Sequence, residues 1–124
     1  MKLDHLVILL TDLKANIDFY DALLPLIGFE KTRDNVFVNR EGIYLDFRQA
    51  DEPNHEYRRY APGLNHLGFT CENKAALIQV KEKLTEAGFH SPEIQVFPDG
   101  EAIFFKDKEG MRVELAYYVD SNEN

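Results

Sequence analysis

The sequence predicts an α+β fold in which two tandem βαβββ modules form a curved mixed sheet around a cavity, with the helices outside. Three observations lead to this prediction. A short segment with a histidine occurs twice, as LDHL at 3–6 and LNHL at 64–67. Each copy is followed by one amphipathic helical pattern, and then by three strand-like segments. An internal repeat of this kind sets the architecture, because each copy folds as one supersecondary unit.

The first module is expected within residues 1–50. LDHLVILL at 3–10 is an apolar run of β character, which predicts a strand covered on both faces. Thr11 is the expected N-cap of a helix whose apolar residues recur at spacings of three and four until Gly28. Three strand-like segments follow, with a hairpin turn at Gly42 between the last two: FEKTR, VFVN and IYLDFRQ.

The second module is expected within residues 63–119, after a polar connection at 50–62 that contains two prolines. A strand comes first, and Asn73 then caps a helix that ends near Gly88. The predicted strands of this module are LNHLGFTC, EIQVF, AIFFK and MRVELAYY. Residues 121–124 are expected to be a frayed tail, so that 1–120 form a single domain.

Composition restricts the classes of function. The net charge of −8, from 14 basic and 22 acidic residues, disfavours a nucleic-acid-binding protein, which needs a concentrated basic surface. No apolar run approaches the roughly 20 residues of a membrane-spanning helix, and Asp4 and His5 interrupt any signal-peptide core. A single cysteine, Cys71, excludes an internal disulfide. We therefore expect a cytoplasmic protein whose partner is a small-molecule substrate, with neither nucleic acid nor membrane.

Four side chains are unusual for strand interiors. Asp46 lies in IYLDF and Glu114 in RVELAY, although an unpaired buried carboxylate costs several kcal/mol. Ion pairs at i, i+2, to Arg48 and Arg112, are one explanation for the two carboxylates, and a lone histidine in a strand is usually a hydrogen-bonded core residue. The other explanation is a metal. A histidine on the first strand and a carboxylate on the last strand of both modules would together satisfy a divalent ion.

These motifs, in this order, resemble the vicinal oxygen chelate superfamily, which includes glyoxalase I, bleomycin resistance proteins and extradiol dioxygenases. The resemblance covers essentially the whole chain and rests on three motifs: LDHLVILLTDLKANIDFYDALLPLIGFE, PGLNHLGF and FKDKEGMRVELAYY. It places the family's metal ligands at His5, Asp46, His66 and Glu114. The second ligand is usually Glu or Gln, so Asp46 is one methylene shorter. Two-module chains of this family commonly dimerise, which implies a homodimer.

The resemblance also implies a function. We expect a metal-dependent lyase or isomerase resembling glyoxalase I, in which a divalent ion (Ni, Zn, Mn or Fe) chelates vicinal oxygens and Glu114 is the catalytic base. Leu9 and Ala50 stand where glutathione-dependent members carry a basic and an amide residue, which argues against glutathione. Two alternatives remain: a metal-free binding protein like the bleomycin resistance members, and an iron-dependent dioxygenase.

The connection between the modules offers candidate substrate-binding residues. Arg58, Arg59 and Tyr60 could form a lid or an anion-binding edge over the cavity. A solvated linker whose tyrosines pack on the outside explains the same residues equally well.

Overall fold

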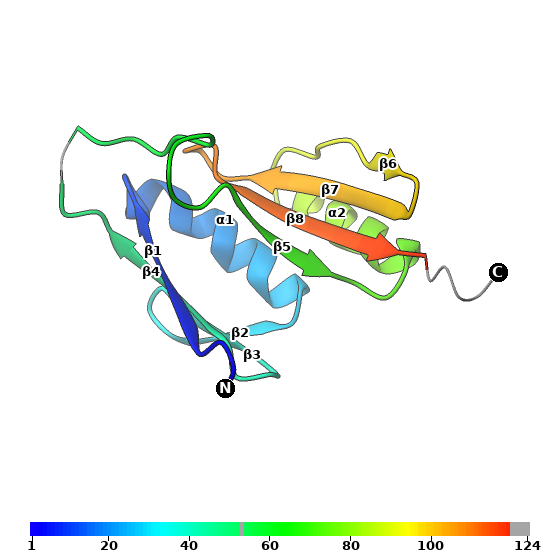
Figure 1. Ribbon diagram of the computed structural model, residues 1–124, viewed down its shortest axis with the longest axis horizontal. Helices are drawn as coiled ribbons and strands as arrows, with labels where there is room; N and C mark the ends of the chain where they lie inside the picture. Colours follow the sequence, from blue (N-terminus) through cyan, green and yellow to red (C-terminus); the bar gives the residue numbers. More distant parts are fainter. Residues whose placement is uncertain (53, 120–124) are drawn as a thin grey trace. The chain divides into compact units, whose positions relative to one another are not determined.

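The computed structural model describes residues 1–52 and 54–119, so the tail expected at 121–124 lies outside the described residues. The chain divides into two compact units, Met1–Tyr57 and Arg58–Asn124. Each unit contains one helix and four strands in the order βαβββ (Figure 1). The predicted α+β class and the tandem repeat are therefore confirmed.

The first unit is a mixed four-stranded sheet with one helix. Its strands lie in the order β1-β4-β3-β2; β1 is parallel to β4, and the other neighbours are antiparallel. The predicted hairpin turn is present between β3 and β4, with Gly42 at φ 78°. The elements are β1 His5–Leu10, α1 Leu13–Leu26, β2 Phe29–Arg33, β3 Val36–Asn39 and β4 Tyr44–Gln49.

Helix α1 covers only one face of this sheet. The rings of Tyr20 on α1 and Phe47 on β4 lie 4.2 Å apart, and Leu10 points to the same covered face. The alternate residues of β1, Val7 and Leu9, are 43% and 56% exposed. The prediction that β1 is covered on both faces is therefore wrong. Each unit has one helix, so the other face of its sheet is not covered by an element of the same unit. The apolar run of β1 does not reveal that one of its faces is uncovered.

The start of α1 also differs from the prediction by one residue. The side chain of Asp12, not of Thr11, is the N-cap, because Asp12 Oδ1 accepts a hydrogen bond from Ala15 N at 3.1 Å. Thr11 Oγ1 instead donates to the backbone oxygen of His55 at 3.2 Å. Both residue types can cap a helix, so residue type alone does not decide between the two positions.

The second unit repeats the arrangement, with strand order β5-β8-β7-β6. Asn73 caps α2 as predicted, since its Oδ1 accepts from Ala76 N at 2.9 Å. Leu77, Val80 and Leu84 form the buried stripe of this helix. The strand predicted over EIQVF is shorter than expected and begins at Gln95. The elements are β5 His66–Thr70, α2 Lys74–Glu86, β6 Gln95–Phe97, β7 Gly100–Lys106 and β8 Arg112–Tyr118.

The two units share the same register around the histidines. In unit 1, His5 is the Cα partner of Tyr44, two residues before Asp46. In unit 2, His66 is the partner of Arg112, two residues before Glu114. Because side chains alternate along a strand, each carboxylate lies on the same face of its sheet as the histidine of its unit.

Neither helix has the length or the apolar character needed to cross a membrane, within the part of the chain that is described.

Candidate metal and ligand site

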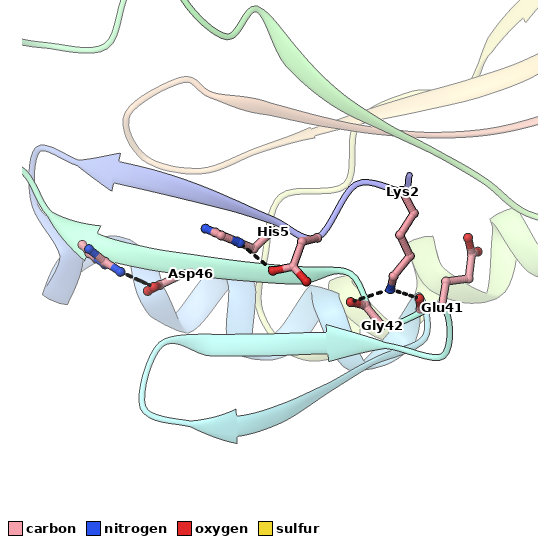
Figure 2. Close-up of polar contacts among 7 residues, drawn as sticks. Lys2, His5, Glu41, Gly42 and Asp46 are labelled. Carbon is pink, nitrogen blue, oxygen red and sulfur yellow. Dashed lines mark hydrogen bonds and ion pairs between the residues drawn. The ribbon is translucent and has the colours of Figure 1, made fainter.

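The two predicted ligands of unit 1 lie on the face of its sheet that α1 does not cover. A pocket of about 260 Å³ opens there. His5 and Asp46 both line it, from the adjacent strands β1 and β4 (Figure 2). The other lining residues are Asp4, Arg33, Val36, Tyr44 and Arg48. The structure thus brings the two predicted ligands of this unit to one small pocket.

Asp46 has a basic partner on its own strand. Arg48 donates from Nη2 at 2.7 Å and from Nε at 3.1 Å, and both bonds go to Oδ2 of Asp46. The hydrogen bond from Arg48 holds the pKa of Asp46 below its usual value, and the charges of Arg48, Arg33 and His5 act in the same direction. The ion pair expected as an alternative to metal binding is therefore present here. Because Arg48 uses one oxygen only, Oδ1 is not engaged by that guanidinium.

In unit 2, the other two predicted ligands are in direct contact. His66 Nε2 lies 3.0 Å from Glu114 Oε1, across the parallel pair β5 and β8. The side chains are 34% and 19% exposed. The alternative pairing of Glu114 with Arg112 is wrong, since Arg112 Nη1 donates to Gly110 O at 3.3 Å and Glu114 pairs with His66 instead.

Each histidine is held by the residue that precedes it in the chain. His5 Nδ1 lies 2.7 Å from Asp4 Oδ2, and His66 Nδ1 lies 2.7 Å from Asn65 Oδ1. Asn65 is itself oriented, because its Nδ2 donates to the backbone oxygen of Arg59 at 2.8 Å. The sequence reading missed Asp4 and Asn65. The signal was available in the repeat itself, where LDHL and LNHL both place a hydrogen-bond acceptor before the histidine.

These contacts fit a divalent ion in three respects. Two ligands that each lie about 2.1 Å from an octahedral ion are about 3.0 Å apart, and the Nε2–Oε1 separation of His66 and Glu114 is 3.0 Å. A ligating histidine usually gives its other ring nitrogen to a carboxylate or carbonyl oxygen, as both histidines do here. Imidazole and carboxylate are also the donors that zinc, nickel and manganese accept.

Each unit holds one imidazole and one carboxylate of the predicted set. Among the described residues, no three His, Cys, Asp or Glu side chains lie close enough together to hold an ion by themselves. The assignment of all four residues to one site therefore stays a prediction.

Arg58, Arg59 and Tyr60, the predicted substrate-binding residues, stand at the start of unit 2. Tyr60 is 82% exposed. The guanidinium of Arg59 lies 4.9 Å from the centre of the Tyr60 ring. The backbone of Arg59, through Asn65, is what connects this segment to His66. Their role in substrate binding stays a prediction.

Unit 2 also has a pocket, of about 250 Å³. It lies beside Glu114 and is formed by residues of β6, β7 and β8 and of the turn between β6 and β7. The lining residues are Phe97, Asp99, Gly100, Glu101, Ala102, Glu114, Ala116 and Tyr118. Apart from Glu114, the sequence reading named none of them as site residues.

Comparison with known proteins agrees with the family resemblance of the sequence motifs. The sequence model of the Glyoxalase/Bleomycin resistance protein/Dioxygenase superfamily matches residues 2–115. The uncharacterized protein YqjT of Bacillus subtilis (strain 168) is 33% identical over 121 residues, which cover 90% of this chain and 94% of that protein.

Two solved structures show the same fold. A glyoxylase/bleomycin resistance protein/dioxygenase domain from Frankia sp. EAN1pec superposes with a TM-score of 0.76 at 22% identity, covering 98% of this chain and 94% of that one. The fosfomycin resistance protein FosX from Listeria monocytogenes superposes with a TM-score of 0.71 at 16% identity, covering 100% and 98% of the two chains.

Proposed function

Because this chain belongs to the Glyoxalase/Bleomycin resistance protein/Dioxygenase superfamily, we propose that it is a metal-dependent lyase or isomerase. Its substrate is a small molecule with two adjacent oxygen atoms. The observation that carries the proposal is the contact of 3.0 Å between His66 Nε2 and Glu114 Oε1. In this contact an imidazole and a carboxylate, both largely withdrawn from solvent, are spaced as two neighbouring ligands of one ion.

The proposed ligands are His5, Asp46, His66 and Glu114, either within one chain or shared between the two chains of a homodimer. Asp4 and Asn65 hold the Nδ1 atoms of the two histidines, which leaves the Nε2 atoms to bind the ion. Arg48 holds Oδ2 of Asp46, which leaves Oδ1 for the same purpose. When bound, the ion supplies Lewis-acid stabilisation of negative charge on the substrate oxygens.

Glu114 is the residue that moves the proton. It lines the unit 2 pocket, so a ligand in that pocket lies beside Glu114. Glu114 has one more methylene than Asp46, whose Oδ2 is tied to Arg48 by two hydrogen bonds. The longer and less restrained carboxylate is better suited to leave one partner and accept a proton from a carbon or oxygen of the substrate.

A metal titration of the protein purified without chelator tests the proposal. We expect Ni²⁺, Zn²⁺ or Mn²⁺ to bind and to raise the free energy of unfolding, by about 2.7 kcal/mol at a metal concentration 100 times the dissociation constant. His66→Ala and His5→Ala should each abolish this gain. His90→Ala is the matched control, since His90 is exposed and lies outside both pockets.

Substrate class can then be searched with the metal-loaded protein. Thermal shift with α-hydroxyketones, thiohemiacetals and catechols identifies the compounds that bind, and turnover of those compounds is then measured.

Two results of the metal titration contradict the proposal. One is the absence of metal binding in the wild-type protein, and the other is a loss of the metal-induced stabilisation in His90→Ala as large as in His66→Ala.

A second function is favoured by one specific contact. The Arg48–Asp46 ion pair neutralises a predicted ligand without any metal, as a binding protein of the bleomycin resistance type would require. In that case ligands should raise the unfolding temperature equally in the presence and absence of a chelator. Metal-free function is contradicted if a chelator abolishes ligand binding by the wild type and added metal restores it. His66→Ala should then not bind the ligand with or without added metal.

A further inference from the structure

The unit 2 pocket has a chemical character of its own. Alternate cross-strand pairs on β7 and β8, which share one face of the sheet, form it: Gly100 opposite Tyr118 and Ala102 opposite Ala116, with Glu114 next on the same face. The two alanines are almost fully buried, at 1% and 3%. Small side chains therefore form the floor of the pocket, and the larger lining residues surround this floor.

Two aromatic side chains border this floor. Phe97, the partner of Gly100 on β6, is 43% exposed, and Tyr118 on β8 is 58% exposed. Single exposed aromatic residues are ordinary on a protein surface. Two of them at one pocket, above a floor of small residues, offer apolar surface to a flat group that enters between them.

The size of the pocket limits its occupant. An engineered apolar cavity of about 150 Å³ is known to bind benzene. A volume of about 250 Å³ therefore accepts one six-membered ring with a few further atoms. A helix or strand of another protein is far larger, so the occupant is part of a small molecule.

The charges of the pocket limit the occupant further. Two carboxylic acids, Asp99 and Glu114, supply the charge of its lining, and a basic side chain does not occur among the lining residues. The side chain of Glu101 lies on the opposite face of β7 from Gly100 and Ala102, where Lys74 Nζ is 3.1 Å from its Oε1. The unit 1 pocket differs, since Arg33 and Arg48 line it. An anionic group is therefore disfavoured in unit 2, whereas a neutral or cationic one is not.

We propose that the unit 2 pocket is a subsite for an uncharged or cationic, ring-sized apolar group of the ligand, held between Phe97 and Tyr118 next to Glu114. The assignment of this group to the substrate rests on the proposed function. The subsite itself does not require the metal, because Glu114 is the one proposed metal ligand among its lining residues.

A titration of the ¹⁵N-labelled protein with ring probes in the presence of a chelator tests the subsite. Benzyltrimethylammonium and benzyl alcohol should shift the amide signals of residues 97–102 and 114–118. Benzoate should bind at least about fivefold more weakly, because its carboxylate meets Asp99 and Glu114. Phe97→Ala should weaken binding of the first two probes by about 3- to 10-fold.

Val96→Ala is the matched control. Val96 is the neighbour of Phe97 on β6, is 77% exposed and does not line the pocket, so this variant should bind like the wild type. Ala116→Leu fills the pocket and should abolish binding; its folding is checked by thermal unfolding.

Four results would overturn the subsite. The first three are shifts that spread over other residues, binding of benzoate as tight as that of the other two probes, and equal losses of affinity in Phe97→Ala and Val96→Ala. The fourth is a shift of residues 97–102 that depends on protein concentration alone, which would identify the face as a contact between copies. The metal titration is separate, so loss of metal binding with intact ring binding contradicts only the proposed function.

Discussion

Asn65 Oδ1 lies 2.7 Å from His66 Nδ1 and turns the other ring nitrogen, Nε2, toward Glu114. A neutral imidazole that donates from Nδ1 to Asn65 has a lone pair at Nε2, which can bind a cation, whereas an imidazolium donates from both nitrogens and forms an ion pair with Glu114. The distance of 3.0 Å between Nε2 and Oε1 suits both states. In both states Asn65 sets the orientation of the ring toward Glu114.

Replacing Asn65 should weaken metal binding without removing a ligand. We expect Asn65→Ala to raise the dissociation constant for Zn²⁺ or Ni²⁺ by about 10- to 100-fold, because the ring loses its orientation. Asn65→Asp keeps the acceptor and should restore most of the affinity. Isothermal titration calorimetry measures both. Equal affinities in wild type and Asn65→Ala would contradict an orienting role.

The equivalent change in unit 1 is Asp4→Ala. Asp4 is 73% exposed, so its loss should hardly change the stability of the metal-free protein, while metal affinity falls about tenfold or more. Asp4→Asn should behave nearly like the wild type. Asp18→Ala, which removes an exposed carboxylate from α1, is the control for a general effect of charge. If Asp18→Ala weakens binding as much as Asp4→Ala, the effect is electrostatic and not positional.

A second polar cluster, away from the candidate ligands, predicts a dependence of stability on pH. Glu101 accepts hydrogen bonds from Tyr117 and Lys74, which lower the pKa of Glu101, and the carboxylate in turn raises the pKa of Tyr117. A lowered carboxyl pKa stabilises the fold above the unfolded value, about 4.3. A raised tyrosine pKa stabilises it below the unfolded value, about 10.

The stability lost in Tyr117→Phe should therefore be greatest between about pH 5 and pH 9. It should shrink as the pH falls through the lowered pKa of Glu101, and again as the pH rises through the raised pKa of Tyr117. Urea unfolding of both proteins across this range measures the difference. A difference that stays constant from pH 3 to pH 11 would show that the hydrogen bond does not contribute.

Two glycines of unit 2 should respond differently to alanine. A Cβ at Gly100 would lie 2.0 Å from the backbone oxygen of Tyr117, so the pairing of β7 with β8 would have to shift. We expect Gly100→Ala to cost about 3 kcal/mol or more. A Cβ at Gly68 would lie 3.6 Å from Glu114 Oε1, an ordinary contact, so Gly68→Ala should cost less than about 1 kcal/mol. Thermal unfolding of the two variants tests this; similar losses would contradict it.

The sequence contained enough information for the order of elements and for which candidate ligands share a unit. The repeat placed His5 and Asp46 in one unit, and His66 and Glu114 in the other, and each pair shares a sheet face. Periodicity also identified the buried stripe of α2 and its cap at Asn73. These features depend on local pattern, which a single sequence carries.

Features that depend on long-range contacts were missed. The exposure of Val7 and Leu9 depends on which face α1 covers, and Thr11, the expected cap, contacts the backbone of His55 instead. The pocket of unit 2 arises because Ala102 and Ala116 meet across two strands. Hydrophobic pattern alone does not specify which small residues become opposite neighbours.

The shared register of the two sheets has a consequence for how this protein can change over evolution. The histidine and the carboxylate of a unit are separated by 41 residues in one case (46 − 5) and by 48 in the other (114 − 66). Hairpins and connections can therefore gain or lose residues while the histidine and the carboxylate of each unit stay on the same face of their sheet. A single deletion inside a ladder strand such as β8 would instead turn one donor toward the helix, so natural variants should differ in their turns and agree in the lengths of these strands.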